Sequence, residues 1–276
     1  MPKTLTAPVK KRPVSFGKVA KLAAADAAKL AADLETGTSL SDEQIHRIRV
    51  FFKKLRALVH MGRGVMRKRE RREWNTRIQK AARGLSAARD GVVLAGWLEK
   101  ACAAQDSMTD AEKAAFLELL GNGYPRRLPR GARDAVLDVL HAVANEWPSS
   151  LGKLTKHPKI GLQFMRNSAR EEALEAISDR HPETWHSWRR RVKYVAYQVE
   201  WLARAQKKEP GVDYTRWRRL GSALGKMNDM HNLEHWIERA AQSLSWSETL
   251  RNWAKDGAEG YAKNALKLAK NWHKRG

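Results

Sequence analysis

Cysteine and long apolar runs are scarce in this sequence of 276 residues, and each scarcity excludes a class of protein. The one cysteine, Cys102, excludes an intrachain disulfide framework and a zinc site built on cysteine thiolates. No stretch reaches the roughly eighteen apolar residues of a transmembrane helix, and no apolar core of a secretory leader follows Met1. We therefore expect a protein of the reducing cytoplasm that does not insert into a membrane.

Acidic residues are also in deficit, because 30 aspartates and glutamates face 53 lysines and arginines. The formal net charge at pH 7 is +23, and the isoelectric point is near 10.4. Such an excess of one sign destabilises a compact chain through self-repulsion. The charge therefore predicts a polyanionic partner or an anionic membrane surface, and it says nothing about the fold.

Glycine and proline are sparse, and no long run of alternating β-branched residues appears. Ala, Leu, Lys, Arg and Glu dominate, which is typical of an all-α protein. Ser41 and Gln44 match a capping box at a helix start, and Asp90 is expected to cap a helix over 91–104. Glycine and proline residues between the apolar segments mark helix ends. Together these signals predict one helix that begins after Ser41 and further helices over 19–34, 67–83, 91–104, 109–120, 132–146, 160–178, 183–207, 213–227, 230–245 and 248–272.

The helix that follows Ser41 carries a row of cations. On a helical projection His46, Arg49, Lys53 and Arg56 share one polar stripe, opposite an ordinary apolar face. No Asp or Glu occurs from Gln44 through Arg69. Solvated helix faces usually mix the two signs at i, i+4 spacing, so this stripe favours anion binding over a merely exposed face. Arg77, Lys80 and Arg83 form a second basic row on the next expected helix.

The first stripe returns far downstream. Aligning His46 with His186 also aligns Arg49 with Arg189 and Lys53 with Lys193. A little over forty residues later, 85–90 corresponds to 224–229 in the second copy. Two ordered matches at similar separation indicate an internal duplication of a helical unit. We therefore expect a flexible basic tail over 1–18 and one domain over 19–276, with similar halves over 19–147 and 148–276, whose basic helices meet in one groove.

Four short patterns together resemble the conserved histidine α-helical domain (CHAD) family over residues 20–270. They are His46-x-x-Arg49-x-x-x-Lys53-Lys54-x-Arg56, Arg89-Asp90, His186-x-x-Arg189-x-x-x-Lys193-x-x-x-Tyr197, and Leu224-Gly225-x-x-Asn228-Asp229. The resemblance implies two four-helix-bundle halves related by a pseudo-twofold axis, with a basic central groove or pore. It also implies binding of long-chain inorganic polyphosphate and recruitment to polyphosphate granules. No β-rich segment is present that could supply the triphosphatase domain fused to some relatives.

The expected ligands combine the basic rows with the patterns of the resemblance. The residues expected to bind the polyanion are His46, Arg49, Lys53, Lys54, Arg56, Arg77, Lys80, Arg83, Arg89, His186, Arg189, Arg190, Lys193, Tyr197, Arg216 and Arg219. Lys53 and Lys54 keep the charge but lack the forked geometry that arginine offers to phosphate.

The acidic and amide residues of the patterns are expected to be structural. Asp90 and Asp229 are interpreted as helix caps that also pair with nearby arginines, and Asn228 is expected to be structural as well. No catalytic residue, metal ligand or cofactor is expected, because phosphoryl hydrolysis needs clustered carboxylates that the basic helices lack.

Three functions satisfy the sequence. A non-catalytic module for inorganic polyphosphate is preferred, because the basic stripe carries no aromatic residue for stacking on bases. A helical DNA- or RNA-binding protein fits the same charge. An enzyme of phosphate metabolism would use His46 or His186, each of which can instead bind a phosphate oxygen or pair within the fold.

Overall fold

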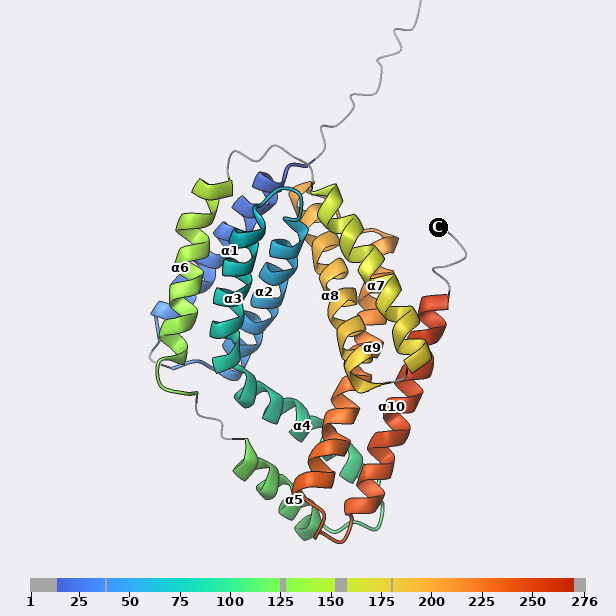
Figure 1. The fold of residues 1–276 in the computed structure, drawn as a ribbon. Coiled ribbons are helices and arrows are strands. Elements are labelled where there is room, and N and C mark those ends of the chain that lie inside the picture. The colour runs from blue at the N-terminus through green and yellow to red at the C-terminus, as the bar shows by residue number, and fades with distance from the viewer. Residues whose placement is uncertain (1–13, 38, 125–127, 152–157, 180, 271–276) are drawn as a thin grey trace, which may run out of the picture.

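The computed structural model describes residues 14–37, 39–124, 128–151, 158–179 and 181–270. These residues form ten α-helices and no β-strand, as Figure 1 shows. The predicted all-α class is confirmed. The helices are α1 (Phe16–Glu35), α2 (Asp42–Met61), α3 (Lys68–Gly84), α4 (Ser86–Ala103), α5 (Asp110–Gly123), α6 (Ala132–Leu151), α7 (Lys159–Asp179), α8 (Pro182–Ala205), α9 (Val212–Ala240) and α10 (Ser247–Lys270).

The helix that carries the first basic stripe starts where the sequence indicates. The Gln44 backbone N–H donates to Ser41 Oγ at 3.2 Å, and the Ser41 backbone N–H donates to Gln44 Oε1 at 2.9 Å. This capping box satisfies two backbone donors that a helix start leaves without partners. The start of α2 is thus fixed about one turn before His46.

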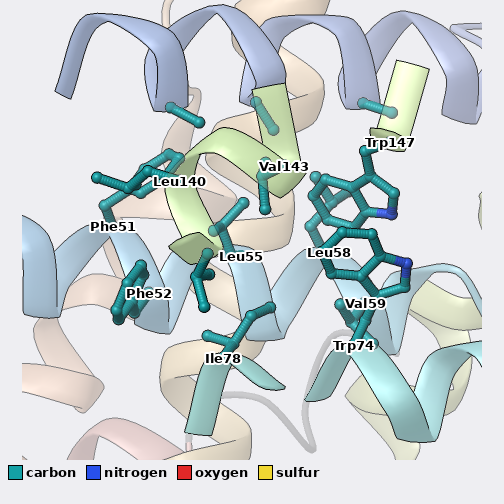
Figure 2. Packing of buried hydrophobic residues seen from close by; sticks show 14 of the residues in the cluster. Phe51, Phe52, Leu55, Leu58, Val59, Trp74, Ile78, Leu140, Val143 and Trp147 are labelled. Carbon is teal, nitrogen blue, oxygen red and sulfur yellow. The ribbon is translucent and has the colours of Figure 1, made fainter. Parts of the chain in front are cut away.

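Helices α1, α2, α3 and α6 share one apolar core. Figure 2 shows Phe52, Leu55 and Leu58 of α2 packed among side chains of α3 and α6. The Trp74 and Trp147 rings lie 5.4 Å apart and close one end of this core. Burial of a large side chain such as Phe52 stabilises the fold by roughly 2 kcal/mol, and the buried face holds the basic stripe of α2 outward.

Helices α7, α8, α9 and α10 form a second core. Trp188 and Val192 of α8 and Leu224 of α9 are fully buried within it. A third cluster joins α4 and α5 to the C-terminal part of α9 and to α10, with Leu98, Phe116 and other apolar side chains at its centre. The hairpin of α4 and α5 lies in the predicted first half of the chain but packs on helices of the second. Equivalence of the two halves as repeats stays a prediction.

Polar contacts fix α2 against α8. The fully buried Gln198 side chain donates to the Ala57 carbonyl at 2.8 Å, and Trp201 Nε1 donates to the Lys54 carbonyl at 3.2 Å. Lys54 Nζ also lies 2.5 Å from Glu200 Oε1. In Figure 1 the two helices approach each other at the top of the view and diverge toward α4. This α2–α8 junction places the two predicted basic stripes beside one another.

The structure corrects three predicted helix boundaries. The expected helices over 213–227 and 230–245 are one continuous helix, α9, so Asn228 and Asp229 lie in its interior and cap nothing. Helix α4 begins at Ser86, which places Asp90 in its second turn and contradicts its predicted capping role. Helix α1 begins at Phe16, a fully buried residue, so a flexible tail cannot extend to residue 18. Residues 1–13 of that tail lie outside the described residues.

Each correction has a physical reason. The Asp90 carboxylate accepts from Arg49 Nη2 at 3.1 Å, so it serves a distant partner and not the start of α4. Asn228 is directed toward His186 of a neighbouring helix, which removes the local backbone bond through which asparagine ends helices. Burial of the Phe16 side chain stabilises the start of α1, which the basic, proline-containing sequence around it does not indicate. Ser15 caps the helix. Within the described residues, no helix has the length and apolar character needed to cross a membrane.

Candidate anion-binding site

A cavity of about 700 Å³ lies where α2 and α8 diverge, and α4, α9 and the end of α5 complete its wall. Six lysine and arginine side chains line it, against two carboxylates. The cations are Arg49, Lys53, Arg89, Arg189, Lys193 and Arg239, and the carboxylates are Asp90 and Asp229. The structure therefore brings together the central residues of both predicted stripes in one space.

Helix geometry explains why these side chains converge. Arg49 and Lys53 are four residues apart on α2, as Arg189 and Lys193 are on α8, so each pair projects from one face of its helix. The α2–α8 junction turns the two faces toward each other. On the α9 side Gly225 has no side chain, and Lys193 Nζ lies 3.6 Å from the place a Cβ would occupy. The amine therefore lies directly against the surface of α9.

Burial and mutual repulsion oppose the charges in this cavity. Burial, followed by the neighbouring guanidinium of Arg49, lowers the pKa of Lys53 from 10.5 to about 8. Burial lowers the pKa of Lys193 further, to about 7, with Arg189 and Lys53 as the next causes. Arg189 also has a lowered pKa through burial, and its Nε is buried without a hydrogen-bond partner in the described residues. Such groups are stabilised when an anion accepts their hydrogen bonds.

The two carboxylates compensate only part of this charge. Asp90 Oδ1 lies 3.1 Å from Arg49 Nη2, and Arg49 Nη1 donates to Ser86 Oγ at 2.8 Å. Asp229 is more buried, and burial raises its pKa even though Arg189 and Lys193 act in the opposite direction. No group of three or more His, Cys, Asp or Glu side chains suited to a metal ion occurs in the described part of the chain. Among the described residues, the cavity thus keeps donors without an acceptor, such as Arg189 Nε.

The two predicted histidines have different surroundings. His46 lines the cavity, and its pKa is lowered by burial and then by Arg89, Lys53 and Arg49. His186 is exposed and lies outside the cavity lining, with its Nδ1 3.1 Å from Asn228 Oδ1. Because an amide oxygen only accepts, Nδ1 carries the proton in this contact. His46 therefore offers a neutral imidazole to a ligand, whereas His186 helps to position α8 on α9.

Other predicted ligands lie in two smaller cavities beside the first. Arg56 and Arg83 line one of about 220 Å³, which shares Arg49 and Lys53 with the large cavity. Tyr197 lines another of about 200 Å³, which shares Lys193. Burial raises the pKa of Tyr197 to about 12, so its phenol stays protonated.

The remaining predicted ligands lie apart from these three cavities. Lys54 pairs with Glu200 at the α2–α8 junction, and Arg77 of α3 lies 3.2 Å from Glu146 Oε2 of α6. Arg190 is exposed and donates to Ser187 Oγ at 3.1 Å. Lys80, Arg216 and Arg219 are exposed residues outside the linings of all three cavities.

Several lining residues escaped prediction from the sequence. Asn232, His235 and Arg239 of α9 line the large cavity, as does Tyr124 at the end of α5. Spacings of three and four residues would have placed the first three on one helix face with Asp229. The expected break between 227 and 230 concealed that face, because it left Asp229 outside both predicted helices and placed Arg239 in the second.

Comparison with known proteins identifies one family. The family model described as CHAD domain matches residues 21–238, which covers most of α1 through α9. No curated protein matches the chain, and no solved structure matches it. The matched residues include every basic residue of the large cavity except Arg239.

Proposed function

We propose that this chain, which belongs to the CHAD domain family, binds long-chain inorganic polyphosphate in the large cavity without transforming it. The single observation that carries the proposal is the meeting of Arg49, Lys53, Arg189 and Lys193 in one cavity. Burial of four cations around two carboxylates is costly unless an anion occupies the space. Arginine supplies forked hydrogen bonds to phosphate oxygens, and lysine supplies point charges.

Adjacent cavities with shared lining residues favour a linear polyanion over a compact one. Arg49 and Lys53 line both the large cavity and the 220 Å³ cavity, and Lys193 links the large cavity to the 200 Å³ one. A small anion would satisfy donors in only one of these spaces. A flexible chain with a charge on every phosphate can engage donors in several of them, and each further contact raises its apparent affinity.

The predicted duplication gives this arrangement a simple origin. If α2 and α8 are equivalent helices of two repeats, the axis that relates them passes close to the α2–α8 junction. The central basic groove expected of the family then corresponds to the large cavity. Association of the protein with polyphosphate granules in the cytoplasm would follow from binding of this polymer.

Two observations favour polyphosphate over nucleic acid and over catalysis. The aromatic residues of the large cavity are Tyr124 and the buried Trp236, and neither lies on the basic helices α2 and α8. Base stacking needs exposed aromatic faces along the path of the strand. For catalysis, His46 would need an orienting acid or a metal-bound phosphate, whereas the groups that most affect its pKa are cations.

Binding should depend steeply on salt. If about four phosphates are neutralised at roughly 0.7 counterions each, affinity should fall about 50-fold between about 50 and 200 mM salt. Reversal of Arg49, Lys53, Arg189 and Lys193 to Glu should abolish binding of long polyphosphate and leave helix content unchanged by circular dichroism. A protein with four exposed lysines reversed instead, Lys21, Lys29, Lys255 and Lys263, provides the charge-matched control.

The same proteins separate the alternatives. Binding of duplex or single-stranded nucleic acid as tight as that of polyphosphate, at physiological salt, would contradict the proposal. Release of phosphate from the polymer by the unchanged protein, and its loss in His46→Ala, would assign an enzyme. If the variant with Arg49, Lys53, Arg189 and Lys193 changed to Glu binds polyphosphate as the unchanged protein does, the ligand binds outside the large cavity.

A further inference from the structure

Beyond Lys53, the basic stripe of α2 reaches a second group of arginines. The rings of His60 and Tyr194 stack with centroids 5.0 Å apart. Around them lie the guanidinium groups of Arg56 from α2, Arg71 from α3, and Arg190 and Arg191 from α8, which all act on the charge of His60. We name these four arginines, with His60 and Tyr194, the arginine site. None of its members except Arg56 lines any of the three cavities.

The arginine site carries an excess of charge. Arg191 Nε lies 2.7 Å from Glu172 Oε1, and within the part of the chain that the structure describes this is the one ion pair of the arginine site. Arg56 donates to the neutral Asn75 amide at 3.0 Å, and Arg190 donates to a serine hydroxyl. Arg71 Nε is buried, and no hydrogen-bond partner for it exists among the residues described.

The imidazole of His60 adds no further charge at neutral pH. Burial, followed by Arg191 and Arg56, lowers the pKa of His60 to about 4. Four guanidinium groups and one carboxylate therefore leave the site with three positive charges. The stacked rings of His60 and Tyr194 lie uncharged beside these guanidinium groups. The neutral imidazole of His60 has one N–H that can donate to a ligand.

Packing of α2 on α8 does not by itself require this excess. Lys54 and Glu200 pair at the other edge of the same junction, at 2.5 Å, and Lys54 lies 6.0 Å from the ring centre of Tyr197. There the junction is built from a neutralised pair beside a tyrosine. At the arginine site the comparable tyrosine, Tyr194, lies among Arg56, Arg190 and Arg191. Of these three, Arg191 alone has an acidic partner among the described residues. This contrast points to a ligand that supplies the missing negative charge.

We propose that the arginine site is a second phosphate-binding site, which holds the part of a polyphosphate chain that extends beyond the large cavity. This inference rests on the proposed function. Arg56 connects the two regions, because it also lines the 220 Å³ cavity together with Arg49 and Lys53. From Lys53 to His60 the helix rises roughly 10 Å, at about 1.5 Å per residue. A chain long enough to bridge this distance gains both sets of contacts, so the site confers a preference for long chains.

The test combines a local signal with a charge-matched pair of variants. The ring resonances of His60 and His46 are assigned in NMR spectra by the variants His60→Gln and His46→Gln. Titration with tripolyphosphate and with long polyphosphate then reports each site separately. In parallel, Arg71→Gln/Arg190→Gln is compared with Lys29→Gln/Lys255→Gln, which removes two exposed cations away from both sites.

Long polyphosphate should shift the resonances of both histidines. Arg71→Gln/Arg190→Gln should weaken binding of long chains by about tenfold or more, the loss typical of hydrogen bonds to charged groups, while binding of tripolyphosphate by the large cavity is retained. Equal affinities for the two double variants, with an unmoved His60 resonance at saturation, would overturn the arginine site.

That failure is distinguishable from failure of the proposed function. Suppose that long chains bind and that reversal of the four cavity cations abolishes binding. A His60 resonance that does not shift would then contradict only the proposal of the arginine site. If long chains do not bind but inorganic pyrophosphate shifts His60, the arginine site stands and polyphosphate is the wrong ligand.

Discussion

Replacement of Lys193 by Met should stabilise the empty protein while it weakens polyanion binding. The Lys193 stem runs along α9, with Cγ 3.5 Å from the position of a Cβ on Gly221. Methionine retains most of this packing and a high helix propensity, so the substitution removes the charge with little other change. The two effects have opposite signs because burial of the charge destabilises the fold, whereas the proposed polyanion would be stabilised by that charge.

The magnitude follows from the pKa. A fall from 10.5 to about 7 corresponds to as much as ~5 kcal/mol of unfavourable free energy for the charged amine. Lys53 and Arg189 share in that repulsion, and a methionine side chain leaves their charges in place. We therefore expect Lys193→Met to raise the free energy of unfolding at pH 7 and low salt by about 1 to 3 kcal/mol.

The pH dependence gives a second check on the same residue. The folded pKa of Lys193 lies below the unfolded value of 10.5, so the folded state binds fewer protons between pH 7 and 10.5. Stability of the unchanged protein should therefore rise with pH across this window, as the penalty on the charged amine disappears. Lys193→Met should show a smaller rise, whereas Lys255→Met, at an exposed position on α10, should behave as the unchanged protein does.

The assay is urea unfolding followed by circular dichroism at low salt, with and without long polyphosphate. The unchanged protein should gain more stability from the polymer than Lys193→Met does, because ligand stabilisation follows affinity. A destabilised Lys193→Met in the absence of polymer, at a pH where the amine is charged, would refute the argument that the cavity is electrostatically strained.

Three further predictions concern the frame around the cavity. His60→Phe keeps the stack on Tyr194 but removes an imidazole whose pKa is about 4 in the folded state and 6.5 in the unfolded state. The unchanged protein should therefore lose stability as the pH falls from 6.5 toward 4, and His60→Phe should not show this loss. In thermal unfolding at pH 5, His60→Phe should be more stable than the unchanged protein by about 1 to 2 kcal/mol. A double-mutant cycle with Lys54→Met and Glu200→Gln should give a coupling energy of about 1 to 2 kcal/mol, and a value near zero would show the pair to be incidental. Gly161→Ala should cost about 3 kcal/mol, because a Cβ there would lie 2.0 Å from the Met61 carbonyl oxygen, and an unchanged urea midpoint would contradict the close approach of α7 to α2.

The sequence predicts helices well where local signals and burial agree. The capping box at Ser41 and the apolar face with Phe52 and Leu55 both belong to α2, and the structure confirms its start. Prediction fails where a polar residue serves a distant partner. Asn228 and Asp229 resemble a helix end, but their side chains face α8 across the fold, so local reasoning divides α9 in two.

The candidate site, too, can be predicted from the sequence only in part. Convergence of Arg49 and Lys53 with Arg189 and Lys193 follows from helix periodicity and from an apparent repeat, and both are visible in the sequence. Residue spacing along the sequence does not show which lysines and arginines pair with a carboxylate in the fold. Arg77 pairs with Glu146 and Lys54 with Glu200 through the packing of helices far apart in the chain. The charge pattern alone therefore does not show which of the predicted ligands lie beside a carboxylate.

Asp90 and Asp229 connect the stability of the cavity to its function. Without them the lining would hold only cations, and the repulsion would oppose packing of α2 and α8. Asp90 engages Arg49 directly at 3.1 Å, whereas burial raises the pKa of Asp229. A phosphate that displaces the contact of Arg49 with Asp90 must compete with this carboxylate, so affinity per phosphate is reduced. Under the proposed function, tight binding would then come from many phosphates on one chain, so a cavity with internal acids would favour a polymer over a single anion.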